Sequence, residues 1–247
     1  MLTVAPPPRV ALVPNAIAFR DPSHGIMGTG WQSCAFTGFG CKPQGTISLT
    51  TDGGRTWTVL LRTPRPVVAV SVDRDHESAR YDDGETIGSS DGGLHWVPVV
   101  VPPATGVGSP CPAGSQAFVV VGWAACASQG SAGNQMKRVY RLGANGWKRL
   151  AARGLSSYGY VAGLAMERDG FGLIWESRGT LYVTRDAGGH WTGLTQIAEP
   201  EVDFGMSAVA LPHGIGFVVL AKGGSEVRRL VETMDAGRSW RVVHVWR

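Results

Sequence analysis

Three stretches of this 247-residue chain carry residue types that could do chemistry. The first is Gly88-Ser89-Ser90-Asp91-Gly92, which fits the G-x-S-x-G pattern of hydrolase nucleophile elbows. A nucleophile elbow lies between a strand and a helix. Here the same residues belong to a motif that recurs along the chain between strand-like runs. We therefore expect a β-hairpin and predict no catalytic serine.

The second stretch is rich in carboxylates that could wrap a calcium ion, which takes about six to eight oxygen ligands. It contains Asp73, Asp75, Glu77, Asp82, Asp83 and Glu85. Their spacing is not that of an EF-hand loop, and Arg74 and Arg80 dilute the negative charge. A solvated loop is favoured over a calcium site, and neither a metal nor a cofactor is predicted.

The third group of candidate residues is a set of carboxylates between positions 167 and 203. Glycoside hydrolases generally work with two carboxyl groups. The candidates are Glu167, Glu176, Glu199, Glu201 and Asp203. Nothing in their spacing pairs them, and the chain has no H-E-x-x-H, P-loop or Rossmann motif. No catalytic residue is predicted.

The elements that would position these residues are marked by a repeated motif, [S/T]-x-D-x-G-x-x-W. Its four copies contain Asp52 and Trp57, Asp91 and Trp96, Asp186 and Trp191, and Asp235 and Trp240. A degenerate copy at 140–147 keeps Trp147 but lacks the hydroxyl and the Asp. The Trp residues of successive motif copies, the degenerate one included, are 39, 51, 44 and 49 positions apart. A period in this range with strand-like content indicates a propeller or another repeat architecture.

Each motif has the chemistry of a tight hairpin corner. The Asp carboxylate can accept hydrogen bonds from backbone N–H groups of its own turn. The Gly allows a positive φ at little steric cost, and the Trp brings a large apolar area to the outgoing strand. We therefore interpret the motif residues as structural rather than catalytic.

The motif resembles the Asp-box, or BNR repeat, of sialidase-like and photosystem-assembly-type β-propellers. This resemblance implies that the boxes lie on the rim, away from any active site. The segment 17–25, IAFRDPSHG, is similar to a phrase that begins blades in photosystem II assembly and stability factors. Sialidases carry an F/Y-R-I-P phrase, and Phe19-Arg20-Asp21-Pro22 departs from it at the third position. Sialidase activity is therefore not favoured.

Five repeats of about four strands each predict an all-β protein with a single five-bladed propeller over residues 15–247. No helix is expected. The Pro-rich segment 1–14 is interpreted as a linker or as a strand that helps close the ring. In the third repeat, residues 117–123 are expected to form one apolar strand. The 35 glycines and the low charged fraction, 17%, suit many tight turns between buried strands.

Charge and hydropathy argue against nucleic-acid binding and against a membrane-spanning segment. The net charge is +4 without a Lys/Arg block, so nucleic acid is not indicated. No apolar run approaches the roughly 18 residues of a membrane span. The first residues, Met1 to Pro8, do not form a signal peptide. The chain is therefore cytoplasmic, or it has lost a signal or an anchor.

The four cysteines bear on this choice. Cys34 and Cys126 share the spacing G-W-x-x-C, and their nearest partners are Cys41 and Cys111. Disulfides Cys34–Cys41 and Cys111–Cys126 are predicted, which favours an extracytoplasmic location. Four buried free thiols are the alternative, and the spacing argues against a zinc site.

The predicted function rests on one face of the ring. In a four-stranded blade, the second turn and the connector between blades lie opposite the boxes. Arg and Tyr are enriched at protein interfaces, and this face is expected to collect Arg62, Arg65, Arg80, Tyr81, Arg153, Tyr158, Tyr160 and Arg178, with Lys42 and Lys222. We predict a non-catalytic binding or assembly protein with a protein partner. The alternatives are a sialidase-like glycoside hydrolase, a glycan-binding module, or ordinary solvated loops.

Overall fold

The computed structural model describes residues 14–30, 44–73, 76–100, 108, 110–177, 180–194, 197, 203–222 and 227–246. These residues form twenty strands and one 3-10 turn, η2 (Pro212–Gly214), with no α-helix in this part of the chain. The strands make five antiparallel four-stranded sheets, each built from consecutive strands. The expected all-β architecture of five four-stranded blades is confirmed.

The blades follow chain order. Blade 1 contains β1 (Pro14–Phe19), β2 (Gly25–Gly30), β3 (Gly45–Thr50) and β4 (Thr58–Thr63). Blade 2 contains β5 (Val67–Asp73), β6 (His76–Tyr81), β7 (Thr86–Ser89) and β8 (Val97–Pro98). Blade 3 contains β9 (Gln116–Val120), β10 (Trp123–Ala127), β11 (Lys137–Gly143) and β12 (Gly146–Arg149). Blade 4 contains β13 (Val161–Met166), β14 (Gly172–Glu176), β15 (Leu181–Thr184) and β16 (Thr192–Leu194). Blade 5 contains β17 (Asp203–Leu211), β18 (Ile215–Lys222), β19 (Arg228–Thr233) and β20 (Arg241–Trp246).

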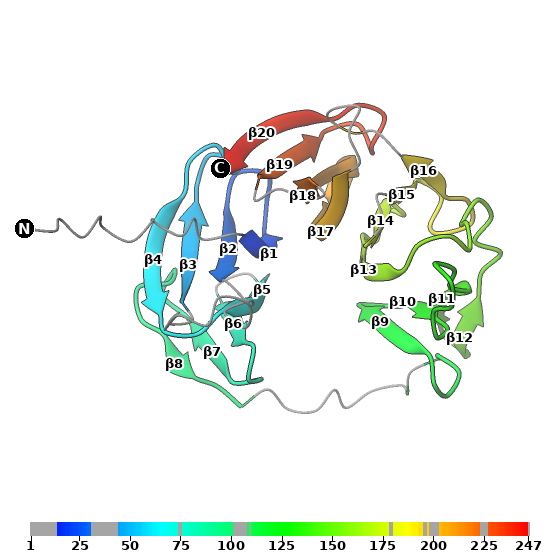
Figure 1. Cartoon of the computed structure of the whole chain (residues 1–247), viewed down its shortest axis with the longest axis horizontal. Helices are drawn as coiled ribbons and strands as arrows, with labels where there is room; N and C mark the ends of the chain where they lie inside the picture. The colour runs from blue at the N-terminus through cyan, green and yellow to red at the C-terminus, as the bar shows by residue number, and fades with distance from the viewer. Residues whose placement is uncertain are drawn as a thin grey trace, which may run out of the picture.

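The blades stand around a common axis, with the first strand of each blade innermost and the fourth outermost (Figure 1). Blade 5 returns to blade 1, where β17 packs against β1 and the Ile17 N–H donates to Ser207 Oγ at 3.1 Å. The middle strands of blade 4 are covered by blade 3 on one side and blade 5 on the other. All five residues of β14 are buried, whereas only one of the six residues of β4 is buried.

The core consists of four apolar clusters that lie between blades. Phe171 and Val218 belong to the cluster between blades 4 and 5, and Ile174 and Val139 to that between blades 3 and 4. The other two clusters join blades 5 and 1, and blades 1 and 2. None of the four joins blade 2 to blade 3. Each packed junction buries apolar area from two sheets, which is the main stabilising term of the fold.

The junction between blades 2 and 3 is open in the described part of the chain (Figure 1). No pair of strands from these blades packs closely, whereas every other junction has such a pair. Large apolar side chains are exposed on the flanking segments, with Val97 58% and Val119 55% exposed. We call this junction the seam; among the described residues, it has the least packing between neighbouring blades.

The degenerate fifth motif accounts for the seam. In the four full motifs, the glycine two residues after the Asp lies against an apolar side chain of the preceding blade, and the four pairs are Gly54–Leu230, Gly93–Leu60, Gly188–Leu150 and Gly237–Val183. Blade 3 has a short turn between β11 and β12 instead, and no atom lies within 4 Å of a Cβ built on Gly146. Among the described residues, this glycine therefore has no contact with blade 2 like that of the glycines in the full motifs.

The expected single strand at 117–123 is wrong. Residues 116–120 form β9 and 123–127 form β10, with a hairpin turn at Val121 and Gly122. Gly122 has a φ of 76°, which an L-residue rarely adopts, so this glycine permits the reversal. The continuous apolar run conceals the turn.

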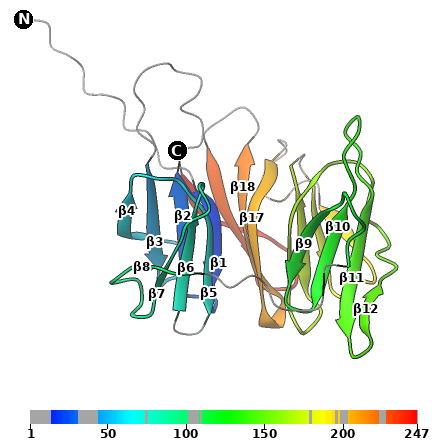
Figure 2. The ribbon, with the colours of Figure 1, turned by 90° about the horizontal axis from the view of Figure 1, so that it is seen from below.

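The ring has two faces, which Figure 2 shows from the side. The turn face carries the four repeated motifs and the turn between β11 and β12. The connector face carries the loop between the second and third strands of each blade and the connectors between blades. The loop between β10 and β11 and the turn between β11 and β12 mark opposite edges in Figure 2.

Candidate functional site

The four repeated turns satisfy their own polar groups. In the first, Asp52 Oδ1 accepts hydrogen bonds from the Thr56 N–H and the Thr50 hydroxyl, both at 2.9 Å. The Thr56 hydroxyl donates to Asp52 Oδ2 at 2.7 Å, and the Gly54 N–H to Thr50 Oγ1 at 2.8 Å. The Trp57 indole N–H donates to the Gly54 carbonyl at 2.9 Å. Little hydrogen-bonding capacity remains for a ligand.

The other three turns repeat this arrangement. Asp91, Asp186 and Asp235 each accept from the backbone four residues on and from the hydroxyl two residues back. Hydrogen bonds from Thr56 and His190 lower the pKa values of Asp52 and Asp186 to about 2. The pKa of Asp91 is held below its usual range chiefly by the His95 N–H, and that of Asp235 chiefly by the Ser239 hydroxyl. These carboxylates are therefore ionised and committed to their turns.

The motif tryptophans pack to different depths. Trp191 is buried, at 4% exposure, in the cluster between blades 3 and 4. Trp57, Trp96 and Trp240 are half-buried against the other clusters. Trp147 packs against none of these clusters, and its indole N–H donates to the Gly108 carbonyl at 2.9 Å. Only the full motifs thus anchor one blade on another.

On the connector face, the sequence-predicted residues of blades 1 and 2 gather around the turn between β6 and β7. Arg65 Nη1 donates to Asp83 Oδ2 and Glu85 Oε2, both at 2.7 Å. Its guanidinium carbon lies 3.9 Å from the ring centroid of the buried Tyr81. The Arg65 hydrogen bonds lower the pKa values of both carboxyls. Arg65 and Tyr81 thus occupy each other. Asp83 and Glu85, two of the carboxylates considered for a calcium site, are paired with Arg65.

Arg62 and Arg80 are also on this face and are exposed. Arg62 is near the end of β4, and Arg80 precedes Tyr81 at the end of β6. Neither guanidinium has an ion-pair or hydrogen-bond partner within the described ranges. Their donors are therefore open to an incoming group.

The residues predicted from blades 3 and 4 are dispersed. Tyr158 is 52% exposed in the connector between β12 and β13, and the Tyr160 hydroxyl accepts from the Gly133 N–H at 3.0 Å. Arg153 lies nearer the repeated turn of blade 4, because its N–H donates to the Gly189 carbonyl at 2.9 Å and its carbonyl accepts from the Trp191 N–H at 2.7 Å. Arg178, Lys42 and the cysteine pair Cys34–Cys41 are outside the described residues, as is the side chain of Lys222.

The sequence did not predict a buried ion pair at the junction of blades 3 and 4. Lys137 Nζ lies 2.7 Å from Glu176 Oε1, with side-chain exposures of 3% and 0%. The contact has ion-pair distance but not hydrogen-bond angles. The same Nζ donates to the carbonyls of Ser156 at 2.6 Å and Tyr158 at 2.7 Å. Burial raises the pKa of Glu176, and Lys137 opposes this shift. The pair therefore fastens the connector that carries Tyr158.

Other site chemistry is sparse in the described ranges. There, no group of three or more His, Cys, Asp or Glu side chains is arranged to hold a metal ion. Among the hydrolase candidates, Glu176 is ion-paired with Lys137, Glu199 and Glu201 are outside the described residues, and the side chain of Asp203 is not described. The disulfide Cys111–Cys126 is present as predicted. No described helix has the length and apolar character to cross a bilayer.

No family model and no curated protein matches this chain. Among solved structures, "YCF48 bound to D1 peptide" is 14% identical, covers 95% of this chain and 83% of that chain, and has a TM-score of 0.33. "YCF48 from Cyanidioschyzon merolae" is 15% identical over 96% and 86%, with a TM-score of 0.35. The GH74 xyloglucanase from Xanthomonas campestris is 14% identical over 93% and 38%, with a TM-score of 0.39. At such low identity and TM-scores, these likenesses say nothing about what this chain binds or cleaves.

Proposed function

We propose that this chain is a non-catalytic propeller that binds a protein partner through its connector face. The observation that carries the proposal is the pair of exposed arginines, Arg62 and Arg80. Neither is paired with any described side chain; Arg62 is three residues before Arg65, and Arg80 directly precedes Tyr81. Arginine offers several donors in a fixed geometry and is frequent among the residues that dominate protein interfaces.

The contrast between the two faces supports this choice. The four repeated turns use their Asp and hydroxyl oxygens internally, so they offer a partner little that differs from blade to blade. The described connector-face loops differ in length and contacts. The turn between β6 and β7 is short and charged, whereas the loop between β10 and β11 is longer and mostly small and polar. Loops held on a rigid scaffold are where binding specificity is usually carried.

We place the protein outside the cytoplasm within this proposal. The disulfide Cys111–Cys126 supports an oxidising compartment. A second disulfide, Cys34–Cys41, is predicted from the sequence and would strengthen that inference. Non-reducing peptide mapping of protein from its native source should recover both linked peptide pairs. Four alkylatable thiols would remove the support for this location.

A matched pair of charge reversals tests the binding face. Arg62→Glu with Arg80→Glu changes the connector face, and Arg55→Glu with Arg238→Glu makes the same change in net charge on the turn face. All four arginines are exposed. Proteins captured from native extract by the wild type should be lost with the first variant and kept with the second. Loss with the second variant alone would mean that the turn face binds the partner.

A further inference from the structure

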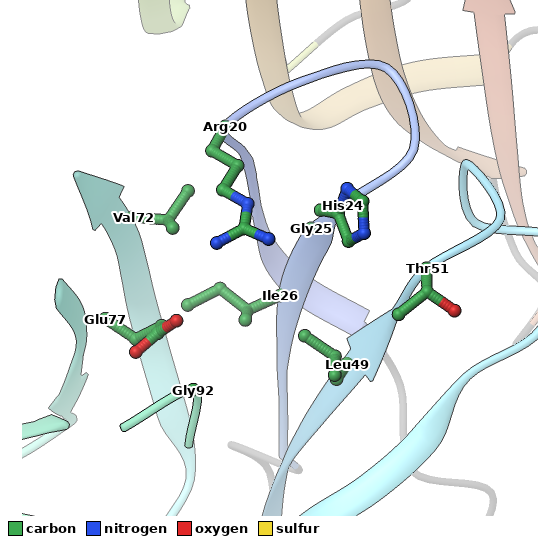
Figure 3. Close-up of a pocket in the computed structure, with 9 residues that line it drawn as sticks. All are labelled: Arg20, His24, Gly25, Ile26, Leu49, Thr51, Val72, Glu77 and Gly92. Atoms are coloured by element: carbon green, nitrogen blue, oxygen red, sulfur yellow. The ribbon is translucent and has the colours of Figure 1, made fainter. Parts of the chain in front are cut away.

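A small hollow opens between blades 1 and 2 on the turn face, away from the proposed protein-binding face. Its volume is about 160 Å³, and its apolar wall is formed by Ile26, Leu49 and Val72. Arg20 and His24 also line it, with 42% and 39% of their side chains exposed. Figure 3 shows the side chains of Arg20, Ile26 and Glu77 pointing toward one another.

Glu77 is the unusual member of this lining. It is only 5% exposed, and its Oε2 atom accepts no hydrogen bond from the described residues. Burying a carboxylate is unfavourable unless another group pairs with it. Arg20 points toward Glu77 but forms no ion pair with it, and its Nε pairs instead with Asp21 Oδ2 at 3.5 Å. Among the described residues, none therefore pairs with the Glu77 carboxylate at the wall of this cavity.

The other blades show that this acidic residue is an exception. Glu77 stands opposite Ser89, the hydroxyl residue of its motif, in the pairing of β6 with β7. In the other three blades with a full motif, the residue opposite the hydroxyl is glycine, namely Gly25, Gly172 and Gly216. Blade 2 thus carries a carboxylate where its counterparts carry no side chain.

The equivalent space between blades 4 and 5 is filled. The Phe171 ring, only 3% exposed, lies 3.1 Å from a Cβ built on Gly216. Phe171 immediately precedes Gly172, as His24 immediately precedes Gly25. The His24 ring does not fill the space, because its Nδ1 is 3.0 Å from both carboxylate oxygens of Asp21. The hollow therefore arises where His24 stands in place of a phenylalanine, and Glu77 in place of a glycine gives it a carboxylate.

We propose that this hollow binds a protonated primary amine on a short aliphatic chain. The ammonium group would donate to Glu77, and the methylenes would lie against Ile26, Leu49 and Val72. Charge-assisted hydrogen bonds of this kind are among the stronger ones in proteins. A cavity of about 150 Å³ accommodates a benzene-sized molecule, so the hollow suits about five or six heavy atoms. A free alkylamine and the lysine side chain of a partner both meet this description.

The test is a titration of the full chain with n-butylamine and, separately, with its neutral analogue n-butanol. Binding is followed by the backbone amide shifts of Gly25 and Gly92 in NMR spectra. We expect saturable shifts with the amine and at least tenfold weaker binding of the alcohol. Glu77→Gln should weaken amine binding at least tenfold, and the exposed, matched control Asp82→Asn should leave it unchanged.

A second variant keeps Glu77 and removes the space. His24→Phe introduces the phenylalanine that fills the equivalent space in blade 4. The variant should therefore abolish amine binding while preserving the melting temperature. No saturable amine binding by the wild type would overturn the proposal, as would equal binding of amine and alcohol or unchanged binding by Glu77→Gln or His24→Phe. Titration with Nα-acetyl-lysine-N-methylamide then distinguishes the sources. Binding comparable to that of butylamine identifies a lysine of a partner, and its absence identifies a free amine.

Discussion

The turn face and the connector face of the ring differ in how far their loops repeat from blade to blade. On the turn face, four copies of one motif repeat nearly the same hydrogen bonds, and each presses a glycine against the preceding blade. On the connector face, the described loops share neither length nor contacts, and charged groups range from the buried Lys137 to the exposed Arg80. The repeated turns therefore pack the blades together, and the differing loops of the connector face are available to recognise a specific partner.

Removing one partner of the Lys137–Glu176 ion pair should have the largest effect on the free energy of unfolding. Lys137→Met leaves the Glu176 carboxylate buried without a counter-charge, which typically costs about 3–5 kcal/mol. Denaturant unfolding measures the loss. The double variant Lys137→Met with Glu176→Leu should regain most of it, since the uncompensated charge is gone. No difference between the single and the double variant would mean that the pair does not couple these two blades.

Truncation of the motif tryptophans should separate deep anchors from shallow ones on the turn face. Trp191→Ala should destabilise by about 3–5 kcal/mol, the usual range for a buried tryptophan, and the half-buried Trp96→Ala by less. Trp147→Ala, in the degenerate motif, should cost the least. The free energies of unfolding of the three variants provide the check. A cost for Trp147→Ala equal to that for Trp191→Ala would contradict the account of the seam.

Acid should weaken the turn face. The motif Asp residues have folded-state pKa values below their ordinary value of about 3.9. Their contribution is therefore present above that pH and is lost as the pH falls through the folded pKa, about 2 for Asp52 and Asp186. The melting temperature should fall between about pH 4 and pH 2. Asp52→Asn with Asp186→Asn should make that fall shallower, and an unchanged slope would argue against these hydrogen bonds.

The sequence predicted the two faces unequally, for physical reasons. Each full motif contains its own acceptor, hydroxyl and glycine, so a local pattern was enough to locate the hairpins and the five blades. The Lys137–Glu176 pair was missed because its members are far apart in sequence and meet only when two blades pack. The predicted Arg and Tyr residues do not form one cluster, since Arg153 pairs with a repeated turn while Arg65 and Tyr81 occupy each other. Side-chain partners on a varied face depend on the ring itself.

Reversing Arg62 and Arg80 should have the smallest effect on stability. Both side chains are exposed and outside the packed clusters, and surface changes of this kind usually stay within about 0.5 kcal/mol. Thermal unfolding of the double variant should therefore match that of the wild type. A large loss would mean that these arginines hold the blades together, and reduced partner binding by the variant would then reflect a damaged fold.

Site-specific photo-crosslinking in native extract tests the central claim most directly. A photoreactive residue replaces Asp82, exposed in the turn between β6 and β7 on the connector face, or Leu94, 74% exposed on the turn face. Neither position belongs to the arginine pair or to the packed core. A partner that binds the connector face should give a discrete protein adduct from position 82 and none from position 94. An adduct from position 94 alone would contradict the assignment of the binding face.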